Sequence, residues 1–285
     1  MKIFDPSKHQ AKKRFGQNFL HDGNIIDRIV SGIRATEGDN IIEIGPGLGA
    51  ITKQLLPIAK KMNVIELDRD IIPKLKFNCD GLGVLTIHET DALKFDYDQL
   101  CSSEDCKVDQ KGESEVQINL MRIVGNLPYN ISTPILFHLF KYADKIKDMH
   151  FMLQKEVVER MVANPGSKTY GRLSVMTQSV CDARMLFIVP PTAFTPAPKV
   201  ESAIVWLAPR KEKLDIQDRK LFAKIVTEAF NQRRKTLRNT WRKRIGVEDI
   251  ESLGIDASLR PESISLDEYV RVSNFLSQVN ESQAN

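Results

Sequence analysis

Between residues 40 and 154, short apolar segments rich in β-branched residues alternate with segments of helical periodicity. Apolar runs without a polar side are typical of strands buried on both faces, and intervening helices return the chain to the same edge of a sheet. The alternation therefore predicts a mainly parallel sheet covered by helices on both faces. Five segments carry the strand pattern, at 40–45, 62–68, 84–91, 122–126 and 149–154.

Two further strands are predicted at 184–189 and 202–207, with no convincing helix between them. Such a pair should be antiparallel and lie at the late edge of the sheet. The prediction is thus an α/β, Rossmann-like fold with seven strands, the last of them antiparallel. Residues 101–117 interrupt the pattern with five acids and two lysines, and we expect a mobile surface insertion there.

After a linker at 208–215 the strand pattern stops and helical patterns follow. Residues 218–246 read as helix up to Gly246. Ser265 precedes Glu268 by three residues, a capping box that predicts a helix over 265–279. We therefore expect two domains: an α/β domain over 1–210 and an all-helical domain over 211–285.

The net charge of +4 is unevenly distributed. Residues 211–245 hold twelve basic and four acidic side chains, residues 1–34 hold seven and three, and residues 246–285 hold two and eight. Two basic blocks indicate a polyanionic partner, with solvated helix faces as the alternative. No 18-residue apolar run or secretory signal is present, and the cysteines lack metal-site spacing, so we expect a cytoplasmic protein without a membrane span or bound metal.

A glycine-rich loop follows the first predicted strand, with Gly45, Gly47 and Gly49 ahead of a helix. Such loops let a ligand approach the backbone closely, although the spacing departs from the dinucleotide fingerprint. Glu66 ends the second strand, where a carboxylate can accept both ribose hydroxyls, and Asp91 ends the third, where it can accept an adenine amino group. Together these residues favour an adenosine-bearing cofactor at the carboxyl edge of the sheet.

Asn126, Leu127, Pro128 and Tyr129 end the fourth strand at the same edge. The side-chain oxygen of Asn126 and the carbonyl of Leu127 could together hold both hydrogens of a nucleobase amine and free its lone pair. Pro128 favours an extended Leu127 and offers no competing N–H, and Tyr129 could stack on the base. The alternative is an ordinary strand-end turn with a packed tyrosine.

These residues carry a resemblance. "NLPY" resembles the signature of adenine-amino methyltransferases, and "KKRFGQNFLHD", "IIEIGPGLGAIT", "VIELD", "TDAL", "FTPAPKVESAIVWL" and "AFNQRRKTLRN" follow in the order typical of the ribosomal RNA adenine dimethyltransferases that act on the small subunit. The resemblance covers nearly the whole chain. The long acidic segment 101–117 departs from the pattern and affects the expected loop shape, not the chemistry.

The resemblance implies S-adenosyl-L-methionine as the cofactor. It also implies a substrate, namely two adjacent adenosines near the 3′ end of 16S rRNA in a precursor of the small ribosomal subunit. Each would be dimethylated on N6 during ribosome biogenesis, by a protein that we expect to be a monomer. The residues that the resemblance assigns to the cofactor are Asn18, Leu20, Gly45, Gly47, Glu66, Asp91 and Asn126.

The expected mechanism is catalysis by orientation, without a covalent nucleophile or a strong general base. The target base must leave its stack, and Phe194 in a proline-rich loop is a candidate second aromatic wall opposite Tyr129, with burial in the core as the alternative. The candidate catalytic residues are Asn126, Leu127, Pro128, Tyr129 and Phe194.

Residues 231–244 hold seven basic side chains and no acid. On one continuous helix, Phe230, Leu237 and Trp241 would share an apolar face, while Arg234, Arg238 and Arg242 would form a stripe that meets phosphate. The candidate RNA-binding residues are Arg233, Arg234, Lys235 and Arg238. A solvated basic face is the alternative.

Three other functions fit parts of the sequence. An enzyme with the same chemistry could act on large-subunit RNA or on DNA, because the Asn-Leu-Pro-Tyr signature is shared. A non-catalytic assembly or transcription factor could use the same scaffold, and an assembly role could also coexist with catalysis. A nicotinamide oxidoreductase would explain the glycine loop but would leave Asn126–Tyr129 without a function.

Overall fold

The computed structural model describes residues 17–101, 106–108, 114–116, 119–129, 131–232 and 234–284. The chain divides into two compact units: the first is Met1–Lys155 with Arg184–Pro209, and the second is Glu156–Ala183 with Arg210–Asn285. The predicted domain boundary at 210 falls where the chain enters the second unit for the last time. The prediction differs for Glu156–Ala183, which groups with the C-terminal helices because Tyr170 and Val175 pack into their core.

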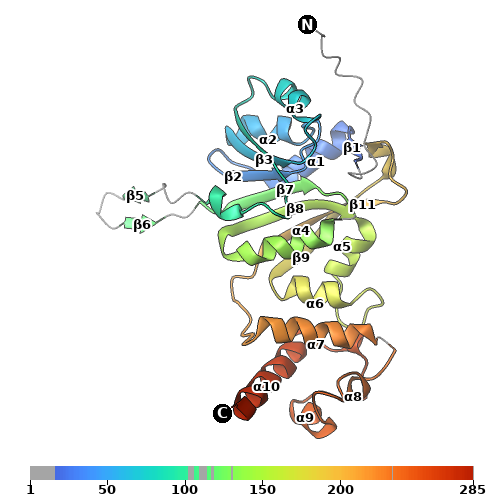
Figure 1. Cartoon of the computed structure of the whole chain (residues 1–285). Coiled ribbons are helices and arrows are strands. Elements are labelled where there is room, and N and C mark those ends of the chain that lie inside the picture. The colour runs from blue at the N-terminus through green and yellow to red at the C-terminus, as the bar shows by residue number, and fades with distance from the viewer. Residues whose placement is uncertain are drawn as a thin grey trace. The chain divides into compact units, whose positions relative to one another are not determined.

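The first unit is built on a seven-stranded sheet in the order β4-β3-β2-β7-β8-β11-β9 (Figure 1). Strands β4, β3, β2, β7 and β8 are parallel, and β11 is antiparallel to β8, which confirms the predicted fold class. The chain passes from β2 to β3 on one side and later returns to β7 on the other, a topological switch point where ligands typically bind. The bounds are β2 Asn40–Ile44, β3 Lys61–Glu66, β4 Val84–Glu89, β7 Met121–Asn126, β8 Ile146–Gln154, β9 Cys181–Val189 and β11 Ser202–Pro209.

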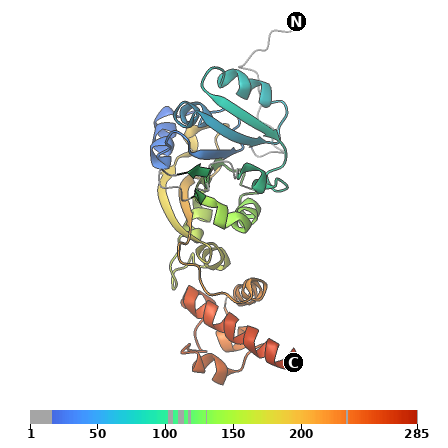
Figure 2. The same ribbon diagram turned by 90° about the vertical axis from the view of Figure 1, so that its left-hand side faces the viewer.

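Helices cover both faces of this sheet, and Figure 2 shows α1 and α4 on opposite sides of it. The helices are α1 (Gly23–Ile33), α2 (Thr52–Ala59), α3 (Ile72–Asn78) and α4 (Ser132–Leu139). Apolar residues of α1, α2 and α3 form one core with alternate residues of the strands, such as Ile41, Val64 and Val124. Their neighbours Ile42, Ile65 and Ile123 are equally buried and point the other way, because side chains alternate along a strand. The central strands β2, β3 and β7 are therefore buried on both sides, as their sequences indicated, whereas β4 at the sheet edge is only partly buried.

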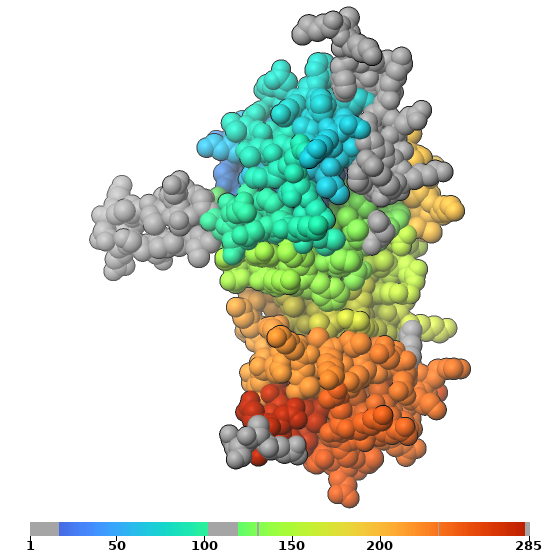
Figure 3. All heavy atoms as spheres, in the orientation of Figure 1, coloured from blue at the N-terminus to red at the C-terminus, as the bar shows by residue number. Residues whose placement is uncertain are grey.

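Two short strands connect the N-terminal segment of the first unit to its late loop: β1 (Phe19–Leu20) pairs antiparallel with β10 (Phe194–Thr195). Within the segment 101–117, which was predicted to be an insertion, β5 (Cys106–Val108) and β6 (Ser114–Val116) form an antiparallel pair. Most other residues of this segment lie outside the described ranges, so its predicted mobility stays a prediction. At the edge formed by α3 and β4, turned toward the viewer in Figure 3, Phe77 and Val84 are exposed. The 3-10 helices here are η3 (Tyr97–Leu100), η4 (Phe140–Lys145) and η5 (Pro191–Ala193).

The second unit is helical and has its own core around Trp241, Tyr269 and Phe222. Its elements are α5 (Lys155–Met161), α6 (Arg172–Gln178), α7 (Arg219–Asn231), α8 (Leu237–Thr240), α9 (Val247–Ser252), η6 (Pro261–Ser263) and α10 (Leu266–Ala284). The predicted capping box is confirmed at the start of α10, where the Ser265 amide donates to a Glu268 carboxylate oxygen at 2.6 Å and the Glu268 amide donates to the Ser265 hydroxyl at 3.3 Å. Among the described residues, no helix has the length and apolar character to cross a membrane.

The single helix predicted over 218–246 is wrong, because α7 ends at Asn231 and α8 starts only at Leu237. Between them Thr236 is extended, with φ −74° and ψ 161°. The amides of Leu237 and Arg238 donate to the carbonyls of Leu259 and Ala257 instead of to the preceding helix turn. These tertiary hydrogen bonds outweigh the local helical preference of the segment.

Candidate active site

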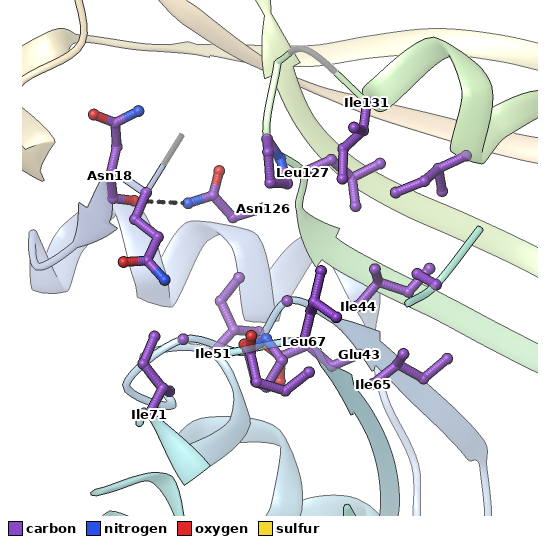
Figure 4. A pocket seen from close by; sticks show the side chains of 18 of the residues that line it. Asn18, Glu43, Ile44, Ile51, Ile65, Leu67, Ile71, Asn126, Leu127 and Ile131 are labelled. Carbon is purple, nitrogen blue, oxygen red and sulfur yellow. Dashed lines mark hydrogen bonds between the residues drawn. The ribbon is translucent and has the colours of Figure 1, made fainter. Parts of the chain in front are cut away.

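A cavity of about 340 Å³ opens at the carboxyl ends of β2, β3, β4 and β7 (Figure 4). This volume is within the range of small-molecule sites. The structure brings almost all of the predicted site residues of the first unit to this cavity. The residues of that prediction that line it are Asn18, Leu20, Gly45, Gly47, Glu66, Asp91, Asn126, Leu127, Pro128 and Tyr129.

The glycine loop forms one wall of the cavity between β2 and α2. Gly45 and Gly47 have φ values of +67° and +55°, a backbone conformation that favours glycine. The Gly45 amide donates to the Ile65 carbonyl at 2.9 Å, which holds the loop against β3. A Cβ at Gly47 would lie 3.4 Å from the Phe19 ring, so the N-terminal segment packs directly on the loop. The loop therefore presents backbone rather than side chains to a ligand.

Two acids lie at the ends of neighbouring strands on the cavity wall. Glu66 is buried, and burial raises its pKa even though the backbone N–H groups of Gly47, Leu67 and Asp68 act against that shift. The Asp68 amide donates to Glu66 Oε1 at 2.7 Å, which orients the carboxylate at the end of β3. Asp91 Oδ1 accepts from the Leu93 amide at 2.9 Å, and its side chain is partly exposed on the cavity. Both acids are thus positioned by the backbone that follows their strand.

A hydrogen bond orients the Asn126 side chain: its Nδ2 donates to the Asn18 carbonyl at 3.1 Å (Figure 4). Because the Asn126 amide nitrogen donates to Asn18, the side-chain oxygen points in another direction and can accept a hydrogen bond. Asn126 lines the same cavity as Glu66 and Asp91, which is the arrangement that the predicted amine-holding role requires. The N-terminal segment thus sets the orientation of this carboxamide.

The next three residues leave β7 along the cavity wall. The Leu127 amide donates to the Met152 carbonyl at 3.2 Å, so that its peptide is anchored to β8. The Tyr129 hydroxyl lies 2.7 Å from the Ser202 Oγ at the start of β11, and burial raises the Tyr129 pKa. Ser202 is fully buried, so this contact fixes the outer end of the tyrosine ring.

Phe194 does not reach the cavity, contrary to its predicted role as a second aromatic wall. Its side chain is 3% exposed and packs in the core with residues of α1 and α2. The reason is its place in β10, directly opposite Leu20 of β1, which turns the ring into the apolar cluster. The structure agrees with the alternative prediction, in which Phe194 is an aromatic residue buried in the core.

Glu43 is a cavity residue that the sequence analysis did not single out. It lies on β2 two residues before Gly45, is buried, and accepts from the Thr52 hydroxyl at 2.6 Å. Burial, together with the charge of Glu66, raises its pKa from 4.5 to about 7. The sequence could have indicated Glu43, because it is the one acid in an otherwise apolar strand segment that leads into the glycine loop.

In the second unit, Arg234, Lys235 and Arg238 are exposed, and Arg233 lies outside the described residues. The break between α7 and α8 means that Arg234, Arg238 and Arg242 do not form a stripe along one helix. Leu237 and Trp241 are buried in the core of this unit and Phe230 packs against it, as predicted. Within the described ranges, no group of three or more His, Cys, Asp or Glu side chains could hold a metal ion.

The sheet order, the glycine loop after β2 and the acids at the ends of β3 and β4 are those expected of a Rossmann-like methyltransferase that uses S-adenosyl-L-methionine. Comparison with known proteins narrows this class. The family model described as "Ribosomal RNA adenine dimethylase" matches residues 8–278, and the chain belongs to that family.

Named relatives agree over nearly the full length. A protein of Pseudomonas aeruginosa (strain PAO1), named "Ribosomal RNA small subunit methyltransferase A", is 51% identical over 273 residues, which are 95% of this chain and 97% of the relative. A protein of Marinobacter nauticus with the same name is 50% identical, covering 97% and 95%. The crystal structure of a dimethyladenosine transferase from Plasmodium falciparum superposes with a TM-score of 0.75 at 25% identity, covering 91% of this chain and 98% of that one.

Proposed function

We propose that this enzyme transfers methyl groups from S-adenosyl-L-methionine to N6 of two adjacent adenosines near the 3′ end of 16S rRNA, giving N6,N6-dimethyladenosine. The names of the relatives support the small subunit as the source of the substrate. One structural observation carries the chemistry: the Asn126 carboxamide, with its nitrogen engaged by Asn18, lies in one cavity with Glu66 and Asp91.

The residues of the cavity fit the proposed cofactor. Glu66 would accept the ribose hydroxyls and Asp91 the adenine amino group, while the exposed backbone of Gly45 and Gly47 would accommodate the methionine end. Leu67 is half exposed on the cavity and offers an apolar surface to the adenine ring. The bound cofactor supplies an electrophilic methyl group, so the protein needs no nucleophile of its own.

The protein contribution to transfer is the orientation of the amine. The exocyclic nitrogen of adenine is a weak nucleophile because its lone pair is delocalised into the ring. Asn126 Oδ1 and the Leu127 carbonyl would accept its two hydrogens, and the Tyr129 ring would hold the base. After two transfers no N–H is left for these acceptors, which explains why the reaction would stop at the dimethylated product.

We place the RNA contact of the second unit at Arg233, Arg234, Lys235 and Arg238. The three of these that the structure describes are exposed, and they lie near the start of α8. Such side chains would give salt-dependent contacts to phosphate without reading the base sequence. Action on a precursor of the small subunit by a monomeric, cytoplasmic enzyme, as a step of ribosome biogenesis, belongs to the same proposal.

A methyl-transfer assay with labelled cofactor tests the proposal on isolated small subunits, large subunits and duplex DNA. We expect Asn126→Ala to lower the rate on small subunits by about 10²–10³-fold, because an acceptor aimed at the reacting group is lost. Asn119→Ala is the matched control, since Asn119 Nδ2 also donates to a carbonyl, that of Gly38, but does not line the cavity. Full activity of Asn126→Ala, or label only in large subunits or DNA, would contradict the proposal.

A further inference from the structure

A second cavity in the first unit lies at the opposite edge of the sheet from the cofactor cavity. Its volume is about 660 Å³. It is lined by Arg122 and Asp148, which lie near the amino ends of the parallel strands β7 and β8, whereas Asn126 ends β7 at the catalytic edge. Residues of α1, β9 and β11 complete it. We call it the α1–β9 groove.

The floor of the groove contains a buried histidine with an unused nitrogen. His150 is 5% exposed and lies opposite Trp206 in the β8–β11 ladder. Among the described residues, its buried Nδ1 has no hydrogen-bond partner. Burial lowers the pKa of His150 to about 4, although the charge of Asp148 and the Gly32 backbone act against that shift. The ring is therefore neutral near pH 7, and Nδ1 offers a lone pair to a donor.

A second acceptor lies beside it. Asp148 Oδ1 is 3.9 Å from His150 Nδ1, too far for a direct hydrogen bond. One nitrogen with two hydrogens can lie within about 2.9 Å of both atoms, since their separation is less than twice that distance. Asp148 is held in place by Arg122, whose Nε and Nη2 donate to its two oxygens at 2.9 and 2.8 Å. The pair of acceptors is thus suited to an amino group.

The rim of the groove combines exposed cations with aromatic rings. The guanidinium carbon of Arg28 lies 4.0 Å from the centroid of the Phe187 ring, and that of Arg184 lies 5.3 Å from the Trp206 ring. Arg34 adds a third exposed arginine at the end of α1. Aromatic rings beside arginines are typical of sites that stack a base and contact its phosphate.

We propose that the α1–β9 groove binds an unpaired ribonucleotide of ribosomal RNA whose base carries an exocyclic amino group. The amino group donates to His150 Nδ1 and Asp148 Oδ1, the base stacks on Trp206, and Arg28 and Arg184 contact the adjoining phosphates. No reaction takes place there, so the groove is an additional RNA contact of the first unit, beyond the proposed methyl transfer.

Tryptophan fluorescence can report occupancy of the groove. The chain has two tryptophans, and Trp241 is fully buried in the other unit, so quenching by RNA reports on Trp206. The full-length protein is titrated with twelve-nucleotide oligoadenylate, oligocytidylate and oligouridylate. We expect the first two to quench and oligouridylate to bind about tenfold more weakly, because uracil has one N–H and leaves one acceptor unpaired.

Two sets of variants test the proposed phosphate contacts and the proposed base contact separately. Arg28→Ala/Arg184→Ala should lower the slope of log affinity against log salt by about 1.4, whereas Lys61→Ala/Lys76→Ala, which removes the same charge from exposed sites on β3 and α3, should not change it. His150→Phe keeps a ring but removes the acceptor, so it should abolish the preference over oligouridylate. Circular dichroism verifies that each variant is folded.

Several results would overturn the proposal. One is the absence of quenching, and another is an arginine variant indistinguishable from the lysine control. Equal affinity for cytidine monophosphate and oligocytidylate would indicate a free nucleotide, and quenching by ribosomal proteins but not by RNA would indicate a protein partner. Methylation of small subunits is measured on the same samples, so that inactivity of every protein would count against the proposed function without affecting the quenching result.

Discussion

Glu43 should make the stability of the enzyme depend on pH. The side chain is buried on β2, and burial with the charge of Glu66 raises its pKa from 4.5 to about 7. Between pH 4.5 and about pH 7, the Glu43 carboxyl is deprotonated in the unfolded chain but still protonated in the folded chain. The contribution of Glu43 to stability is therefore fully present below pH 4.5 and is lost as the pH rises to about 7.

The structure sets the magnitude of this effect. A pKa change from 4.5 to about 7 corresponds to about 3 kcal/mol of unfolding free energy, and Glu43 is only 2% exposed, so solvent screens it little. Glu43→Gln cannot ionise but keeps an oxygen that can accept from Thr52. Relative to the native chain, the variant should therefore gain about 3 kcal/mol between pH 4.5 and pH 8.

Urea unfolding of both proteins at intervals between pH 4.5 and 8, followed by circular dichroism, measures the difference. All other titrating groups are common to the two chains, and the cost of placing an amide in the site is the same at every pH. Glu37→Gln, which changes an exposed glutamate, controls for the loss of one surface carboxylate. A difference between Glu43→Gln and the native chain that stays constant across this pH range would refute the reasoning.

Three further substitutions test other contacts. Gly125→Ala should lower the urea midpoint, since its Cβ would lie 2.6 Å from the Ile44 carbonyl oxygen and force β7 from β2. Arg122→Met should cost about 3–5 kcal/mol in the same assay, because it leaves Asp148 buried without the two donors that hold it. Ser202→Ala frees the Tyr129 hydroxyl, so methyl transfer should fall several-fold while the urea midpoint changes by less than for Arg122→Met. Unchanged midpoints for the first two, or unchanged transfer for the third, would contradict these expectations.

The strands and the cavity were predictable because their signals are local. Each strand of the large sheet had an apolar run, and the acids Glu66 and Asp91 followed strands whose carboxyl ends meet at one edge. The glycines were equally informative, since the positive φ values of Gly45 and Gly47 are a backbone requirement that the residue type reveals. The capping box of Ser265 is of the same kind.

The features that were missed depend on tertiary contacts. The break before Leu237 is due to hydrogen bonds with carbonyls some twenty residues later in the chain. Phe194 is buried because its strand pairs with β1, a partner about 175 residues earlier, and nothing in its own loop indicates this. The grouping of Glu156–Ala183 with the C-terminal helices likewise follows from shared packing rather than from composition.

The hydrogen bond from Asn126 to the Asn18 carbonyl connects two parts of the proposed site. Asn18 is one of the residues proposed to contact the methyl donor, and its carbonyl orients the carboxamide that we propose holds the target base. The two proposed contacts therefore depend on the same peptide group. A change that moves the backbone at Asn18 would therefore also release the Asn126 carboxamide.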